Sequence, residues 1–217
     1  MASKPDSGRG VPGAKPRPPE PEPDRLFPSG KLSGPAVFIG IDPGVNGGLA
    51  WVSVAANGKY TVKADPMPET RLGILKWFSD ASGSQIPRYV VMEKVGGFIS
   101  SGWGEGKKNM ASAHTMFAFG KSVGWVEMAL EVFGMEPKMV VPKVWQDFTG
   151  VLARQYHKVG KKVVWDEKKE AYKGRLKTKA VELFPSAKPT LKTCDALLLA
   201  WYGIMNSEAI TPSCGVR

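Results

Sequence analysis

The stretch that decides the fold is Ala36-Val-Phe-Ile-Gly-Ile-Asp-Pro-Gly-Val-Asn-Gly-Gly-Leu-Ala-Trp51. One apolar run ends at Asp42, a Pro/Gly turn follows, and a second apolar run begins, which predicts two paired strands. Asp42 falls on the opposite face of its strand from Ile41. A carboxylate inside such a strand is costly unless it is paired or binds a metal. This segment alone leaves two interpretations open, a turn aspartate or a metal ligand.

Two other carboxylates occupy similar positions. Glu93 ends the apolar segment Tyr89-Val-Val-Met-Glu93, which is typical of a buried strand. Asp195 lies at the start of Cys194-Asp-Ala-Leu-Leu-Leu-Ala-Trp-Tyr202, an otherwise apolar helix. Three isolated carboxylates, each on an apolar element and far apart in the sequence, favour a convergent metal site.

Length and composition limit the classes of protein to consider. The chain has 217 residues and a net charge of +10, which suits one domain and a polyanionic partner such as nucleic acid. No apolar run approaches the roughly 18–20 residues that span a bilayer, so no membrane partner is expected. The two cysteines, Cys194 and Cys214, form no C-x-x-C pair, and both histidines are isolated, which argues against zinc and a disulfide framework.

The chain divides into three parts. Residues 1–35 hold nine of the 18 prolines and five glycines, which predicts a disordered segment. This segment lacks the apolar stretch of a signal peptide, and it contains four acidic residues, which transit peptides usually avoid, so a transit peptide is not evident. Residues 36–207 form the expected folded domain, and residues 208–217 a C-terminal tail.

Within the domain, apolar periodicity and turn residues predict a mixed α/β sheet flanked by helices. Strands are expected at 36–42, 48–55, 59–65, 89–93 and 138–141. Helices are expected at 71–80, 110–133, 143–149, 167–183 and 194–206.

Positive charge is concentrated late in the chain. Ten basic and three acidic residues lie between Arg154 and Lys179, so this segment accounts for +7 of the net charge. A solvated helix face and a phosphate-binding surface both explain such a cluster. The residues expected to contact DNA here are Lys158, Lys161, Lys162 and Lys168.

The loop after Glu93 is rich in glycine, and it also carries Phe98, Trp103 and two adjacent lysines. Its apolar residues either pack onto the core as a lid or insert between bases. Lys107 and Lys108 favour the second interpretation. The DNA-binding residues predicted here are Gly96, Gly97, Phe98, Lys107, Lys108 and Asn109.

Together these segments resemble the RuvC-type Holliday junction resolvases of the ribonuclease H-like superfamily. The plant plastid branch, the monokaryotic chloroplast proteins, fits best. The resemblance covers residues 36–204, and Ile39-Gly-Ile-Asp-Pro-Gly44 is its most specific part. The other matching segments are Glu93 with its loop, Asn109-Met-Ala-Ser-Ala113, Val141-Pro-Lys-Val-Trp145, Lys173, Glu182-Leu-Phe-Pro185 and Asp195-Ala-Leu-Leu-Leu-Ala200.

This resemblance implies an RNase H-like fold, a five-stranded mixed sheet flanked by helices, whose acids meet at one end. It implies that Asp42, Glu93 and Asp195 bind Mg²⁺ or Mn²⁺, with Lys173 and Lys143 near the scissile phosphate. The implied activity is that of a crossover junction endodeoxyribonuclease, which cuts four-way DNA symmetrically and leaves 5′-phosphate and 3′-hydroxyl ends. The implied roles are DNA recombination, repair and segregation of the plastid nucleoid, with the protein located in the chloroplast.

One position departs from the family pattern. Lys192 stands three residues before Asp195, where the family usually carries a fourth acid or a histidine. Two interpretations of Lys192 are open. It has a catalytic role, in which it orients water or replaces part of one metal's charge, or it is an exposed lysine at a helix N-terminus.

A homodimer is expected, because symmetric cutting of two strands needs two acidic centres. The apolar helix at 110–133 is the expected interface, and Gly120 and Gly124 would allow close approach. The competing interpretation buries this helix against its own sheet.

Two other functions remain open, a non-catalytic DNA-binding module and a nuclease for RNA–DNA hybrids. The segment Ile39–Gly44 also resembles the first phosphate loop of actin-like sugar kinases, but those proteins need a second phosphate loop and a longer chain. No small-molecule cofactor is expected.

Overall fold

The computed structural model describes residues 34–82, 86–95, 112–159 and 162–209. At its centre is a five-stranded mixed sheet with the strand order β3-β2-β1-β4-β5. β1, β2 and β3 are antiparallel neighbours, and β4 and β5 run parallel to β1. The strands are β1 (Ala36–Asp42), β2 (Gly48–Val54), β3 (Tyr60–Pro66), β4 (Arg88–Glu93) and β5 (Pro137–Val140).

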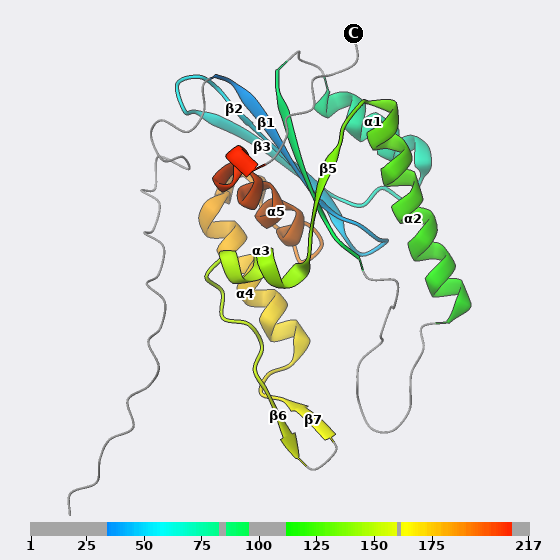
Figure 1. The fold of residues 1–217 in the computed structure, drawn as a ribbon, viewed down its shortest axis with the longest axis vertical. Helices are drawn as coiled ribbons and strands as arrows, with labels where there is room; N and C mark the ends of the chain where they lie inside the picture. Colours follow the sequence, from blue (N-terminus) through cyan, green and yellow to red (C-terminus); the bar gives the residue numbers. More distant parts are fainter. Residues whose placement is uncertain (1–33, 83–85, 96–111, 160–161, 210–217) are drawn as a thin grey trace, which may run out of the picture.

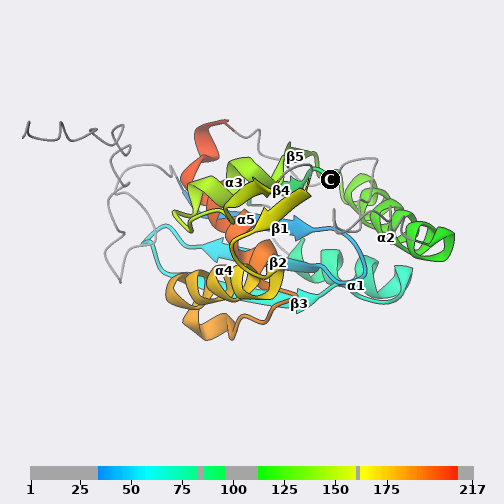
Figure 2. The same cartoon turned by 90° about the horizontal axis from the view of Figure 1, so that it is seen from below.

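Helices cover both faces of the sheet, as Figures 1 and 2 show. Alternate residues of β1 enter two separate cores: Phe38 packs with the helices of one face, and Ile39 with those of the other. The first face carries α3 (Pro142–Phe148), α4 (Lys169–Leu183) and α5 (Cys194–Met205). The second carries α1 (Arg71–Ala81) and α2 (Ala113–Val132). The mixed α/β fold class predicted from the sequence is confirmed.

The backbones of α5 and β1 are in close contact. A Cβ atom at Gly40 would lie 2.0 Å from the carbonyl oxygen of Ala196 and 2.4 Å from the nitrogen of Ala200. Only glycine fits between them. Because Gly40 lies two residues before Asp42, and Ala196 directly follows Asp195, this contact draws the two aspartates together.

The turn between β1 and β2 needs glycine for a different reason. Gly44 has φ +112°, a conformation that other residues rarely adopt, and the ring of Phe119 on α2 lies against it. At Gly47 a Cβ atom would lie 2.0 Å from the carbonyl oxygen of Asp42. The Pro/Gly turn after Asp42 is therefore held tightly from both sides.

The sequence analysis predicted neither the short 3₁₀ helix Pro185–Ala187 nor a hairpin late in the chain. β6 (Tyr156–Val159) and β7 (Lys162–Trp165) form a hairpin outside the main sheet, and Figure 1 shows it extending beyond α4. The guanidinium of Arg154 lies 4.4 Å from the centroid of the Trp165 ring at its base. Each strand has four residues, which is too short a segment for hydrophobic periodicity to predict it.

The remaining differences from the sequence prediction lie at element ends. The expected helix at 110–133 is described over Ala113–Val132, and the basic helix at 167–183 begins at Lys169. A short 3₁₀ helix, Ser207–Ala209, extends the fold two residues past the expected boundary at 207. None of the helices that the structure describes has the length and apolarity needed to cross a membrane.

We predict that Gly40→Ala destabilises the protein by about 1–3 kcal/mol or more, because the methyl group would overlap backbone atoms of α5. The matched control is Gly174→Ala in α4, where a Cβ atom meets nothing within 4 Å. That change should raise stability by up to about 1 kcal/mol through helix propensity. Thermal and urea unfolding measure both variants, and an unchanged Tm for Gly40→Ala would contradict the close contact.

Candidate active site

The sheet brings Asp42 and Glu93 together. Ile41 of β1 pairs in parallel register with Met92 of β4, so the two carboxylates follow side by side at the carboxyl ends of adjacent strands. Both lie in phase with residues of the core that contains α5, Asp42 with Phe38 and Glu93 with Val91. Their side chains therefore leave the sheet on the same face.

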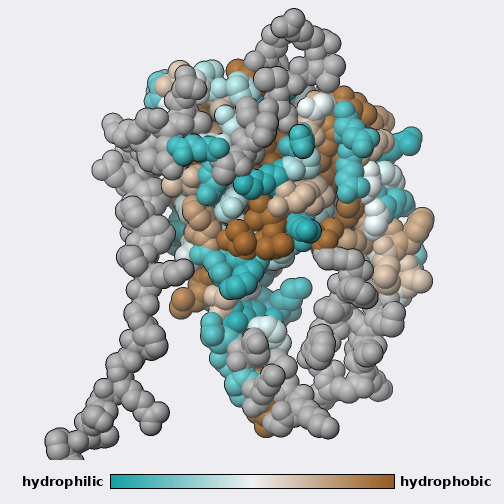
Figure 3. Space-filling view, viewed as in Figure 1, coloured by the Kyte–Doolittle hydropathy of each residue, from teal (hydrophilic) through white to brown (hydrophobic). Residues whose placement is uncertain are grey.

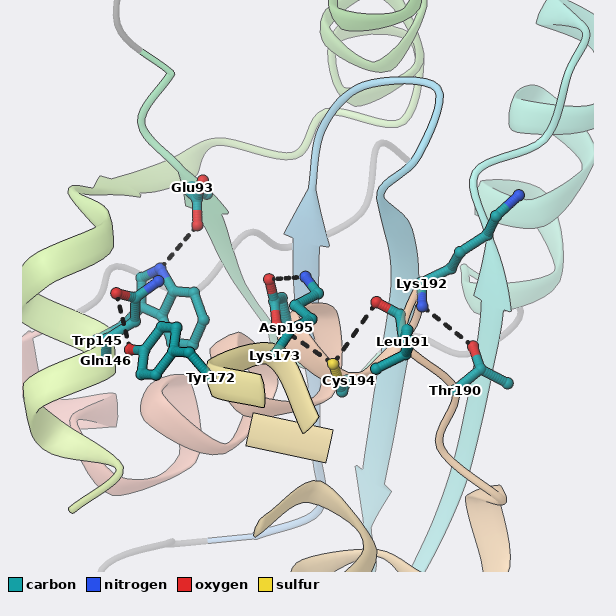
Figure 4. A network of polar contacts seen from close by, with 10 residues as sticks. All are labelled: Glu93, Trp145, Gln146, Tyr172, Lys173, Thr190, Leu191, Lys192, Cys194 and Asp195. Atoms are coloured by element: carbon teal, nitrogen blue, oxygen red, sulfur yellow. Dashed lines mark hydrogen bonds and ion pairs between the residues drawn. The ribbon is translucent and has the colours of Figure 1, made fainter. Parts of the chain in front are cut away.

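Asp195 reaches this end of the sheet from α5. It is 7% exposed, and its Oδ2 forms an ion pair with the ammonium group of Lys173 on α4. Figure 4 shows Lys173 and Asp195 facing one another. All three predicted acids and Lys173 thus lie around one end of the sheet.

The charges of the three acids are coupled. Burial and, after it, the neighbouring carboxylates of Asp195 and Glu93 together raise the pKa of Asp42 to about 8, while Lys173 and Lys169 oppose the shift. Burial also raises the pKa of Glu93. Near neutral pH Asp42 therefore keeps its proton in the metal-free protein, and a bound cation would favour its charged form.

Glu93 and Asp195 each accept a further hydrogen bond. The indole nitrogen of Trp145 on α3 donates to Oε2 of Glu93 at 2.9 Å, which lowers the pKa of Glu93 and partly offsets the effect of burial. The Cys194 thiol donates to Oδ1 of Asp195 at 3.3 Å. Burial and the charge on Asp195 together raise the pKa of this thiol to about 12, so the sulfur remains protonated and able to donate.

Lys169 is a cation that the sequence analysis missed. It is the first residue of α4, one helical turn before Lys173, and its charge lowers the pKa values of both Asp42 and Glu93. The four-residue spacing from Lys173 was a usable signal for it. Lys169 is exposed, in contrast to Lys173, which is paired with Asp195.

Lys192 does not join this group. It is exposed on the turn before α5, and Figure 4 shows its side chain directed away from Asp195. Its backbone N–H donates to the hydroxyl of Thr190 at 3.3 Å. The geometry matches the exposed-lysine interpretation and gives no support to a catalytic role for Lys192.

The other predicted DNA-binding residues have three different outcomes. Lys143 is exposed on α3 and pairs with Asp147 at 2.8 Å, pointing away from the core that holds Trp145. Lys168 is exposed at the N-terminal end of α4, and Lys158 and Lys162 lie in the hairpin strands. The remaining predictions lie outside the described residues: Gly96, Gly97, Phe98, Lys107, Lys108, Asn109 and Lys161.

The donor set suits a hard divalent cation. Asp42, Glu93 and Asp195 supply carboxylate oxygens, the ligands that Mg²⁺ and Mn²⁺ prefer, and a cation would offset the repulsion between them. Within the described ranges, no three acidic, His or Cys side chains are already grouped as a metal site. Lys173 holds one oxygen of Asp195, so a cation would share this carboxylate with it.

The strand order and the strand directions are those of the ribonuclease H-like fold, and Asp42 and Glu93 end two of its adjacent strands. No family model and no curated protein matches the chain. Among solved structures, the chain is similar to Thermus thermophilus RuvC in complex with a Holliday junction substrate, with 15% identity and a TM-score of 0.47 over 81% of this chain and 99% of that one. It is similar also to another Thermus thermophilus RuvC structure, with 16% identity, a TM-score of 0.45 and the same coverage.

Asp42 should make the stability of the metal-free protein depend on pH. Because its folded-state pKa of about 8 exceeds its ordinary value of 3.8, the folded protein keeps a proton that the unfolded chain has released. Raising the pH from 4 to 8 therefore favours unfolding. We predict that Asp42→Asn gains stability over the wild type by up to about 1.4 kcal/mol per pH unit in this window. Urea unfolding in EDTA measures the gain, and a pH-independent difference would contradict it.

Proposed function

We propose that this chain is a metal-dependent endonuclease that cuts four-way DNA junctions. The observation that carries the proposal is the convergence of Asp42, Glu93 and Asp195 at one end of the sheet, beside Lys169 and Lys173 of a basic helix. An acidic centre of this kind suits phosphodiester hydrolysis. The choice of a junction over other DNA comes from the sequence resemblance described above.

In this proposal, each residue of the centre has a defined task. Asp42, Glu93 and Asp195 would hold Mg²⁺ or Mn²⁺, which when bound supplies an activated water and neutralises charge at the phosphate. Lys173 orients Asp195 through their ion pair. Lys169 is exposed beside the centre, where its ammonium group can hold a non-bridging phosphate oxygen of the substrate.

The surface around the centre suits a DNA arm. Figure 3 shows hydrophilic side chains over the part of the molecule that contains α4 and the hairpin. The carboxyl ends of β1 and β4 point toward the same end of the molecule as this surface (Figure 1). A duplex that reaches the acids would therefore pass along the basic segment, where phosphate contacts supply affinity without reading the sequence.

We also propose that the protein acts as a homodimer through α2. Only Ser122, Val126, Ala129 and Leu130 of this helix are buried. Met116 and Phe117 are 42% and 69% exposed, and a Cβ atom at Gly120 or Gly124 would meet open space. The helix is thus not fully buried against its own sheet, and its outer side can accept a second copy.

The first test is cleavage of a synthetic four-way junction with and without Mg²⁺. We predict that Asp42→Asn abolishes cutting, because it removes a charged ligand and keeps the shape of the side chain. Junction binding in EDTA should be unchanged near pH 7, where Asp42 keeps its proton, and stronger above pH 8, where wild-type Asp42 is charged and repels the phosphate. Asp80→Asn, on α1 in the opposite helical layer, is the control and should cut normally. Normal cutting by purified Asp42→Asn would end the nuclease assignment.

The second test concerns the basic segment. Each lost phosphate contact reduces the slope of log affinity against log salt by about 0.9. We predict that replacing Lys168 and Lys169 together with alanine lowers this slope by up to about 1.8. Lys76→Ala, exposed on α1, is the matched control and should leave the slope unchanged. An unchanged slope in the double variant would show that α4 does not track the DNA.

The third test is the oligomeric state. Because Gly124 faces open space, Gly124→Arg should leave the protein folded with an unchanged circular dichroism spectrum. We predict that light scattering finds a dimer for the wild type and a monomer for this variant, which then makes one nick per junction. A wild type that stays monomeric with and without junction DNA would refute the dimer.

A second candidate function is a DNA-binding module with impaired cutting. It is favoured by the ion pair between Lys173 and Asp195, because this carboxylate is then already paired with a cation. Junction binding without Mg²⁺-dependent cleavage by the wild type would select it. Cleavage of an RNA–DNA hybrid in preference to the junction would instead select a hybrid nuclease.

The plastid nucleoid is the proposed location, from the sequence resemblance, and a fluorescent fusion tests it.

A further inference from the structure

One of the two carboxylate oxygens of Glu93 accepts a hydrogen bond from a buried side chain. It is the last residue of β4 and is partly exposed, while Trp145 on α3 is completely buried. The indole N–H of Trp145 donates to Oε2 at 2.9 Å, and Figure 4 shows the ring beside the carboxylate. Oε1 takes no part in this hydrogen bond.

The donor is held firmly in place. Trp145 packs in the same core as Leu197 and Ala200 of α5, the helix that supplies Asp195. The next residue, Gln146, accepts a hydrogen bond from the hydroxyl of Tyr172 on α4 at 3.0 Å. The short helix α3 is therefore tied to the two helices that carry Lys173 and Asp195.

Burial alone does not explain this hydrogen bond. The indole nitrogens of Trp51 and Trp201 are also buried, and neither has a hydrogen-bond partner among the described residues. The fold thus tolerates a buried indole N–H without a partner. The bond from Trp145 goes to one of the three acids of the centre, where the orientation of a carboxylate has chemical consequences.

We propose that Trp145 is a positioning residue: it holds Oε2 of Glu93 and thereby presents Oε1 to the divalent cation. This inference rests on the proposed metal-dependent function and adds to it the residue that orients one ligand. A hydrogen bond to the far side of a ligand commonly decides how well that ligand binds its metal. No spacing in the sequence pointed to this pair, since 52 residues separate the two side chains.

Mn²⁺ binding by the full chain tests the proposal. Free Mn²⁺ is followed by its electron paramagnetic resonance signal during titration, without DNA. We expect Trp145→Phe to weaken Mn²⁺ binding by about 10-fold, within the roughly 10–100-fold range of such outer contacts. Junction binding in EDTA should stay within about twofold of the wild type, which a general loss of structure would not allow.

Two other tryptophans provide matched controls. Trp201→Phe removes the same atoms from the same core, but its indole N–H has no partner among the described residues. Trp77→Phe removes a 2.9 Å indole–carboxylate hydrogen bond, to Asp65, outside the acidic centre. Both variants should bind Mn²⁺ within about twofold of the wild type, whatever their loss in Tm.

A second variant covers the case in which Trp145→Phe does not fold. Trp145→β-(3-benzothienyl)alanine keeps the bicyclic shape and replaces the N–H with sulfur. It should show the same loss of Mn²⁺ affinity with a near wild-type Tm. Wild-type affinity for Mn²⁺ in this isosteric variant, or in a folded Trp145→Phe, overturns the positioning role.

The outcome separates the two proposals. A wild type that binds Mn²⁺ and cuts no junction refutes the nuclease function, while the ratio of Mn²⁺ affinities still decides the role of Trp145. A wild type that cuts the junction and keeps its Mn²⁺ affinity after loss of the indole N–H refutes only the positioning role. A wild type that binds no Mn²⁺ refutes both.

Discussion

The close contact between α5 and β1 is the constraint on which the rest of the structure depends. Gly40 lets the backbone of α5 approach β1 to a separation that no larger residue permits. This approach buries Asp195 beside Asp42, and the parallel pairing of β1 with β4 adds Glu93. Three carboxylates are thereby held together at one end of the sheet, against their mutual repulsion.

Helix α4 supplies the cations that lie beside these carboxylates. Lys173 pairs with Asp195, and the carboxylate raises the pKa of Lys173 above its ordinary value in spite of burial, which acts in the opposite direction. Lys169, one turn earlier, lowers the pKa values of Asp42 and Glu93 and stays exposed. The same helix therefore stabilises the acidic centre and presents a positive surface to a phosphate.

Helix α3 shows how one short element separates a buried function from an exposed one. Trp145 enters the core and binds Glu93, while Lys143, two residues earlier, faces solvent and pairs with Asp147. The family resemblance placed Lys143 near the scissile phosphate and gave Trp145 no role of its own. Seven residues are too few for a hydrophobic pattern to show which side faces the acids.

The sequence by itself determined the main elements of the sheet, its helices and the three acids. Apolar runs that end in a single carboxylate identify Asp42 and Glu93, because alternation and burial are local properties that a strand expresses directly. Tertiary structure alone decided the hydrogen bond from Trp145, the place of Lys169, and the orientation of Lys192 away from the centre. Each depends on how separate elements pack, and local sequence carries no record of that packing.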